Sequence, residues 1–213
     1  VLAQVRLRTD LVNSAIVTDD ELTSYINASL AELHDLLVGV DSEYLINTQS
    51  ITLTGAEKYA LPDDFQELKK VDFIVGGETF DAQRVSIAEK NRYTNLRGTW
   101  SRFDKGPAAY YFVAGPYLYV LPLGLTGGTL AVMYYPTAPV LSAPDSGFDS
   151  LNRLDEYIVC DVCAKVCAKL NLEGLGGWLS QKAAMKARVE TMGQDRDASD
   201  SWGMSRLPRG SRW

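Results

Sequence analysis

All three cysteines of the chain lie within eight residues, at Cys160, Cys163 and Cys167, in the sequence C-D-V-C-A-K-V-C. Thiolates bind zinc and iron–sulfur clusters, so this spacing suggests a metal or redox site as one hypothesis. On a helix, steps of three and four residues place the three side chains on one face, with successive cysteines about 5 Å apart along the helix axis. Side chains spaced in this way do not converge readily on one metal ion. The pattern therefore favours a buried helix face, because free cysteine behaves as a small hydrophobic residue.

Other residues with catalytic or ligating potential are few. His34 is the only histidine, and it would complete a zinc site only if its helix lay beside the cysteines, so a thiol–metal regulatory protein stays an alternative. Asp63 and Asp64 form a carboxylate pair, but they follow Pro62 at the end of an expected strand, where a turn explains them. We therefore predict no catalytic residue, no metal site, no cofactor and no enzymatic activity.

Composition and charge narrow the class of protein. The 213 residues are 46% hydrophobic and 23% charged, as in ordinary folded proteins, and no apolar run is long enough to cross a membrane. The net charge of -6 lies entirely within residues 1–48, which contain eight acidic residues and two arginines. This negative charge would repel the phosphate backbone of a nucleic acid, so we expect no specific nucleic-acid binding. Because no apolar run is long enough to cross a membrane, we expect no membrane partner either.

Helical signals occur at both ends of the chain. Helices are expected over residues 2–12, from a capping box at Thr18 and Glu21 to about Gly39, from residue 149 or 150 to about 172, and over 178–194. Their buried residues should form the core of a bundle. This predicted core consists of Leu22, Tyr25, Ile26, Leu30, Leu33, Leu37, Cys160, Cys163 and Cys167, with the cysteine face packed on the apolar stripe from Tyr25 to Leu37.

Between the two helical parts, hydrophobic residues recur at every second position, as in β-strands. Runs such as S-I-T-L-T and Y-Y-F-V-A-G-P-Y-L-Y, cut by Gly and Pro, predict an antiparallel β domain of about five or six strands, with a helical turn near residues 86–93. Its many tyrosines leave a ligand-binding β module on a helical scaffold as a second alternative. The predicted fold is α+β: a bundle of about four helices (residues 1–48 and 145–195), interrupted by the β domain (49–144) and followed by an extended C-terminal tail (196–213).

The tail has no periodicity of its own. It contains Trp202 and Trp213, and its last eight residues carry three arginines and no acid. Trp and Arg are the residue types that dominate interface energetics, so the tail could become ordered on a partner.

Several sequence phrases in a fixed order point to a known family. They are T-D-D-E-L-T-S-Y-I-N-A-S-L-A-E-L-H-D-L-L, T-G-A-E-K-Y-A-L-P-D-D-F, A-E-K-N-R-Y, Y-L-Y-V-L-P-L and L-D-E-Y-I-V. Over about residues 2–195, this order resembles the head-to-tail adaptor (connector) proteins of tailed bacteriophages, with a broader similarity to tail tubular protein A and related neck adaptors.

The resemblance implies a structural protein of the virion neck, assembled in the host cytoplasm. Such adaptors form a ring, typically a dodecamer, between the portal protein and a tail or nozzle protein, and double-stranded DNA passes through the ring during ejection without specific binding. The implied portal-binding residues are Trp202, Arg206, Leu207, Pro208, Arg209, Arg212 and Trp213. An acidic lining would keep DNA from adhering, and the candidates for it are Asp19, Asp20, Glu32 and Asp35.

Overall fold

The computed structural model describes residues 1–12, 16–40, 43–94, 109–142 and 154–196. The chain divides into two compact units, which we describe separately: unit 1 comprises residues 1–43 and 138–213, and unit 2 comprises residues 44–137. Five α-helices and two small sheets occur in the described ranges, which confirms the α+β class. Of the predicted C-terminal tail (196–213), the described residues include Arg196 alone, which is the last residue of α5.

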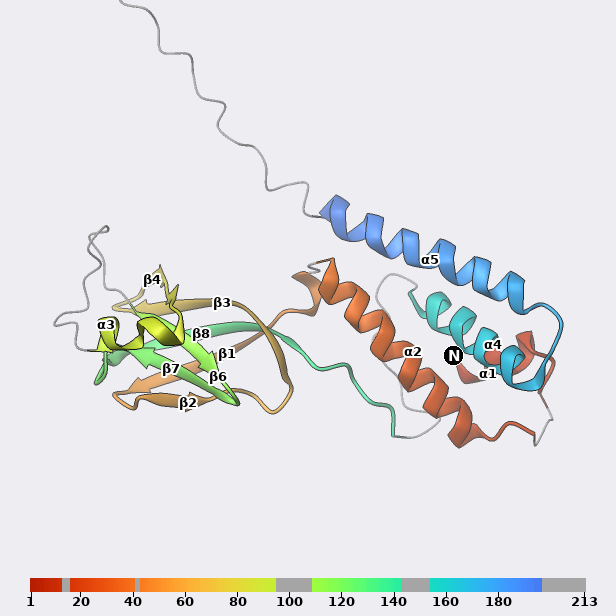
Figure 1. Cartoon of the computed structure of the whole chain (residues 1–213), viewed down its shortest axis with the longest axis horizontal. Helices are drawn as coiled ribbons and strands as arrows, with labels where there is room; N and C mark the ends of the chain where they lie inside the picture. Colours follow the sequence, from red (N-terminus) through yellow and green to blue (C-terminus); the bar gives the residue numbers. More distant parts are fainter. Residues whose placement is uncertain (13–15, 41–42, 95–108, 143–153, 197–213) are drawn as a thin grey trace, which may run out of the picture. The chain divides into compact units, whose positions relative to one another are not determined.

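Unit 1 contains four of the helices (Figure 1). They are α1 (Leu2–Arg8), α2 (Asp19–Gly39), α4 (Asp155–Leu170) and α5 (Leu175–Arg196). The Thr18 hydroxyl caps α2 by accepting a hydrogen bond from the Glu21 amide at 3.2 Å, as the sequence predicts.

Two helix ends differ from the prediction. Helix α1 stops at Arg8 rather than near residue 12, because Asp10 has a φ of 57° and cannot continue a right-handed helix. Helix α5 already begins at Leu175, although Gly176 and Gly177 suggested a break; glycine costs little in a first turn whose amides have no intrahelical partner. The predicted start of α4 at 149 or 150 lies outside the described residues.

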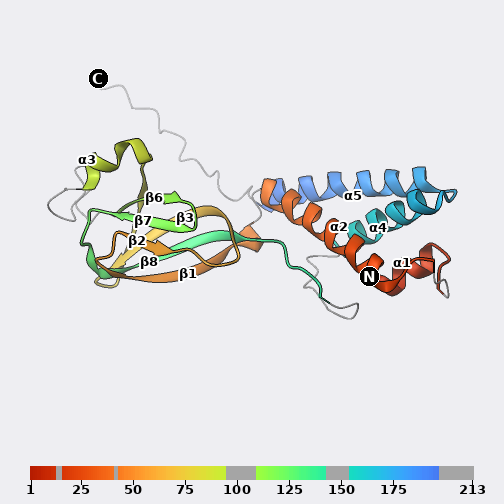
Figure 2. The same ribbon diagram turned by 60° about the horizontal axis from the view of Figure 1, so that its bottom comes forward.

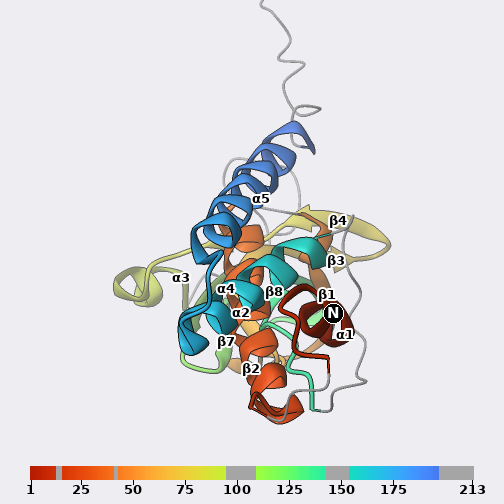
Figure 3. The same cartoon turned by 90° about the vertical axis from the view of Figure 1, so that its right-hand side faces the viewer.

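Helix α4 is the central element of unit 1. It runs antiparallel to α2, because Lys169 near its end contacts Glu21 while Tyr157 near its start contacts Glu32. It is also antiparallel to α5, whose Gln181 lies beside Cys160. Figure 3 shows α4 among α1, α2 and α5, and every side chain from Tyr157 to Ala164 is buried.

Unit 2 is a sandwich of two four-stranded sheets (Figure 2). One sheet has the order β1-β8-β3-β4, with bounds Asn47–Thr54, Thr126–Pro136, Phe65–Val75 and Glu78–Asp81. The other has the order β2-β7-β6-β5, with bounds Lys58–Ala60, Tyr117–Leu121, Tyr110–Ala114 and Gln83–Arg84. The β5–β6 pair is parallel, so the predicted antiparallel arrangement does not extend to this edge.

Alternation along the strands places the core of unit 2 between the sheets. Ile51, Phe73 and Leu130 of the first sheet meet Leu118 and Val120 of the second. Short helical segments complete the unit: η1 (Glu43–Leu45) precedes β1, and η2 (Ile87–Glu89) with α3 (Lys90–Thr94) forms the predicted helical turn.

The aromatic residues of unit 2 are mostly packed. Phe112 and Tyr119 stack with ring centroids 4.7 Å apart, and Tyr93 of α3 packs against the small core that includes Phe112. Tyr111 points to the opposite side, into the core between the sheets. This packing does not favour an open aromatic platform for a ligand.

Candidate functional site: a buried polar network between three helices

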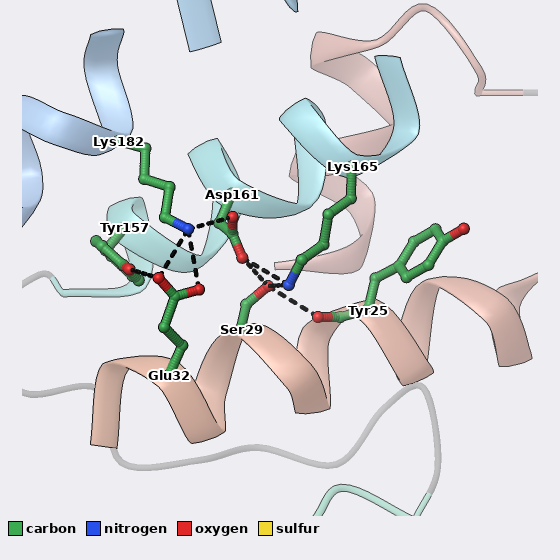
Figure 4. Close-up of polar contacts among 7 residues, drawn as sticks. All are labelled: Tyr25, Ser29, Glu32, Tyr157, Asp161, Lys165 and Lys182. Carbon is green, nitrogen blue, oxygen red and sulfur yellow. Dashed lines mark hydrogen bonds and ion pairs between the residues drawn. The ribbon is translucent and has the colours of Figure 1, made fainter. Parts of the chain in front are cut away.

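The side of α4 that faces α2 is polar. Tyr157, Asp161 and Lys165 follow one another at four-residue steps, so they lie along one helix face. Ser29 and Glu32 of α2 and Lys182 of α5 point toward them (Figure 4). We call Ser29, Glu32, Tyr157, Asp161, Lys165 and Lys182 the Asp161 network.

Asp161 is the buried centre of this network, with only 3% of its surface exposed. Its carboxylate lies 2.7 Å from Lys165 Nζ and 2.8 Å from Lys182 Nζ. The Ser29 hydroxyl donates a third bond to it at 2.6 Å. Two cations from different helices and one hydroxyl therefore satisfy a single buried carboxylate, as burial of a charge requires.

Lys182 links all three helices. Besides Asp161 on α4, its ammonium contacts Glu32 on α2 at 2.8 Å. Glu32 also accepts a hydrogen bond from the Tyr157 hydroxyl at 2.9 Å. Since these bonds have directions, they fix how α5 is placed along α2 and α4 more strictly than apolar contacts would.

The protonation states follow from these contacts. Burial opposes ionisation of Asp161, but bonds from Lys165, Lys182 and Ser29 outweigh it and lower the pKa of Asp161. Burial likewise opposes the charge on Lys182, yet its bonds to Asp161 and Glu32 raise the pKa of Lys182. Burial and the bond to Glu32 raise the pKa of Tyr157. Asp161 and Lys182 are therefore charged at neutral pH, and Tyr157 is a neutral donor.

Ion pairs nearer the surface support the same packing. Lys169 of α4 contacts both oxygens of Glu21 on α2 at 2.5 and 2.6 Å, and this carboxylate also accepts the Tyr25 hydroxyl at 2.8 Å. Arg8 of α1 makes a two-pronged contact with Glu156 of α4 at 2.5 and 3.0 Å.

The predicted site residues fall into separate places. Of the predicted core, Leu22, Ile26, Leu30, Leu33, Leu37 and the three cysteines are buried, whereas Tyr25 is half-buried and bonded to Glu21. Among the acidic candidates, Asp19, Asp20 and Asp35 are exposed, Asp19 is paired with Arg6, and Glu32 belongs to the Asp161 network. All seven implied portal-binding residues, from Trp202 to Trp213, lie outside the described residues.

The cysteine face does not point where we expected. Cys160 Sγ lies 3.7 Å from Gln181 Oε1 of α5, and Cys167 is within hydrogen-bond reach of Trp178 of the same helix. This face is roughly a third of a turn around α4 from Asp161, and it is the polar face that contacts Ser29 and Glu32 of α2.

The thiols themselves are free, buried and poor nucleophiles. Burial raises the pKa of Cys160 and Cys167, and it raises the pKa of Cys163 to about 12. His34 is buried on α2. Across the part of the chain that the structure describes, no three His, Cys, Asp or Glu side chains form a group that could hold a metal ion.

Sequence reasoning missed Asp161, Lys165 and Lys182 as interface residues. A signal for one of them was present, because Lys182 continues the spacing of the inward side chains Leu175, Trp178, Met185 and Val189. A single cation at such a position indicates a partner on the facing helix. The partner on α2 could not be read from spacing alone, since Glu32 and Lys182 are 150 residues apart.

Comparison with known proteins adds the family. Within the described ranges, no helix combines the length and the apolar composition that crossing a bilayer requires. No curated protein sequence matches the chain significantly. The model of one family, described as SU10 adaptor protein, matches residues 2–209, which is nearly the whole chain. The chain therefore belongs to the SU10 adaptor family, a family of bacteriophage adaptor proteins with a structural role.

Proposed function

We propose that this protein is a virion structural protein that forms a ring between the portal and the tail of a tailed bacteriophage, through which the genomic DNA passes. The family match over residues 2–209 carries this proposal. The ring is a dodecamer assembled in the host cytoplasm, and the protein has no enzymatic role. The broader similarity to tail tubular protein A and related neck adaptors belongs to the same proposal.

Each part of the chain has a place in this arrangement. The helical part (residues 1–48 and 145–195) builds the ring, and the β domain (49–144) meets the next tail or nozzle component or the ring periphery. The tail (196–213) reaches the portal through the seven residues from Trp202 to Trp213. The Asp161 network supports this division, because it fixes the helix that precedes the tail to the rest of unit 1.

The acidic surface of α2 lines the channel. Asp20 and Asp35 are exposed there and repel phosphates as the duplex moves past. Asp19 contacts Arg6 and Glu32 contacts Lys182, and each cation weakens the repulsion from its own partner. The test is the double variant Asp20→Lys/Asp35→Lys: rings of this variant retain duplex DNA in a salt-dependent way, whereas rings of the unchanged protein do not.

Electron microscopy of the protein with a cognate portal tests the proposal directly. The expected result is a ring bound to the portal, and a protein that stays monomeric and never joins a portal overturns it. Deleting residues 196–213 should abolish portal docking while the circular dichroism spectrum keeps its helical signal. Trp202→Ala and Ser205→Ala both keep the full length of the tail, so they test whether a particular side chain binds the portal. Only Trp202→Ala should weaken docking.

A further inference from the structure

Strand β1 forms one edge of its sheet, and the amide of Thr54 at its end donates to the Tyr59 hydroxyl at 2.9 Å. It pairs with β8 on one side, from Asn47 opposite Tyr134 to Thr54 opposite Thr126, and no strand of the described residues pairs with its other side. Ile51 and Leu53 point into the core of unit 2. The side chains of Thr48, Ser50, Thr52 and Thr54 are exposed.

The sheet is divided by charge. Strands β1 and β8 contain no charged residue, whereas β3 and β4 contain six, namely Glu67, Lys69, Lys70, Asp72, Glu78 and Asp81. The half of the sheet that ends at β1 is therefore uncharged, and the half that ends at β4 is not.

The other three edges of the sandwich are protected. Strand β4 has four residues with Glu78 and Asp81, β2 has three with Lys58, and β5 has two with Arg84. Shortness and charge are the usual means by which proteins prevent pairing at a sheet edge. Strand β1 has eight residues, no charge and no proline, and its only irregularity in register falls at its end, between Thr52 and Thr54.

We propose that β1 is a strand-addition site, which pairs in the assembled neck with an extended, uncharged segment of a different virion protein. The segment spans up to eight residues. Its side chains alternate between apolar, beside Ile51 and Leu53 at the core, and small polar, beside Ser50 and Thr52. This inference rests on the proposed function.

The edges of this chain argue against a second copy as the occupant. The short charged edges at β2, β4 and β5 cannot supply an uncharged strand of this length. Among the edge strands of the described ranges, only β1 itself would match, and pairing of β1 with β1 is a two-fold contact that closes at two subunits. A ring needs contacts that continue from one subunit to the next, so the pairing strand comes from another protein.

Hydrogen–deuterium exchange tests the proposal on three samples: the protein alone, its ring on the portal, and necks isolated from virions with their tail proteins. In at least one of the two assemblies that contain other virion proteins, about half of the amides of residues 47–54 should exchange at least ~100-fold more slowly than in the protein alone. Unchanged exchange in necks that contain the protein overturns the inference while the proposed function stands. Slow exchange in rings of the protein alone also overturns it, because the occupant is then a second copy. A protein that never joins the neck overturns both.

A matched pair of variants tests the same edge by assembly. Thr52→Lys places a charge on β1, and Thr79→Lys places the same charge on β4, at the opposite edge of the same sheet. Both threonines are exposed, so both variants should fold. Thr52→Lys should lower incorporation into necks at least ~10-fold with ring formation unchanged, and Thr79→Lys should not. Equal incorporation of the two variants overturns the inference, and Ser50→Lys repeats the test should Thr52→Lys misfold.

Discussion

Replacing Lys182 by methionine removes the one cation by which α5 contacts both Asp161 and Glu32. Methionine has a similar length and suits the inward stripe of α5, so the substitution changes charge far more than volume. In the Lys182→Met variant, Asp161 stays buried with two of its three partners, Lys165 and Ser29.

The expected cost follows from those remaining partners. Breaking a buried ion pair so that one charge is left alone costs about 3–5 kcal/mol. Because Asp161 keeps a cation and a hydroxyl, and Glu32 keeps the Tyr157 hydroxyl, we expect a smaller loss of about 2 kcal/mol in the free energy of unfolding. Asp161→Asn should cost a similar amount, and the double variant should cost at least about 1 kcal/mol less than the sum.

Urea unfolding at neutral pH, followed by circular dichroism at the helical band, measures these energies. The signal reports mainly on unit 1, which contains α1, α2, α4 and α5. Lys186→Met is the matched control, since Lys186 is an exposed lysine on the same helix and its loss should change stability by less than about 0.5 kcal/mol. A Lys182→Met variant as stable as the control, or costs that simply add, would refute the role of the network.

Three further predictions concern pH, the thiols and one glycine. Burial acts to raise the pKa of Asp161, but hydrogen bonding outweighs it and keeps this pKa below the ordinary value of about 4. The contribution of Asp161 to stability is therefore present above about pH 4 and is lost as the pH falls further. Urea midpoints between pH 5 and 3 should fall less for Asp161→Asn than for the unchanged protein. With its pKa raised to about 12, Cys163 should react with iodoacetamide at pH 8 roughly 1,000-fold more slowly than a free thiol until the protein is unfolded, and rapid labelling of the folded protein would contradict this. A Cβ at Gly128 would lie 2.3 Å from Phe73 Cε2 in the core. Gly128→Ala should therefore lower the urea midpoint of unit 2 by an amount equivalent to about 1–3 kcal/mol. Gly177→Ala is the control, since it has open space on α5 and should not lower stability.

Capping and hydrophobic periodicity predicted those helices and strands that are determined by neighbours along the chain. The cap at Thr18 and the apolar stripe through Leu22, Ile26 and Leu33 predicted α2, because capping and 3.6-residue periodicity involve neighbours along the chain. The end of α1 was missed, since it depends on the positive φ of Asp10. Strands β4 and β5 were missed as separate strands, because four and two residues are too few to show a period of two.

The Asp161 network could not be predicted from spacing, because its partners come together only when the helices pack. Lys165 was predictable as a neighbour of Asp161 four residues away, but Glu32 and Lys182 are separated by 150 residues. The acidic prediction for Glu32 treated it as a surface charge for the same reason. Which carboxylate faces a channel and which binds a lysine is decided by tertiary contacts.

The pairing of Asn47 with Tyr134 has a consequence for the order of folding during synthesis. This pair brings the two ends of unit 2 together, so once that unit has folded, the chain between α2 and α4 behaves as a short loop rather than one of roughly a hundred residues. With Asn47 paired to Tyr134, the loop between Gly39 and Asp155 shortens from about 115 to about 27 residues, which lowers its closure entropy cost by about 1.3 kcal/mol. Helix α2 leaves the ribosome long before Asp161 and Lys169, which are its partners on α4. Unit 2 should therefore fold first, and its folding should bring α2 close to α4 so that the helices of unit 1 can pack.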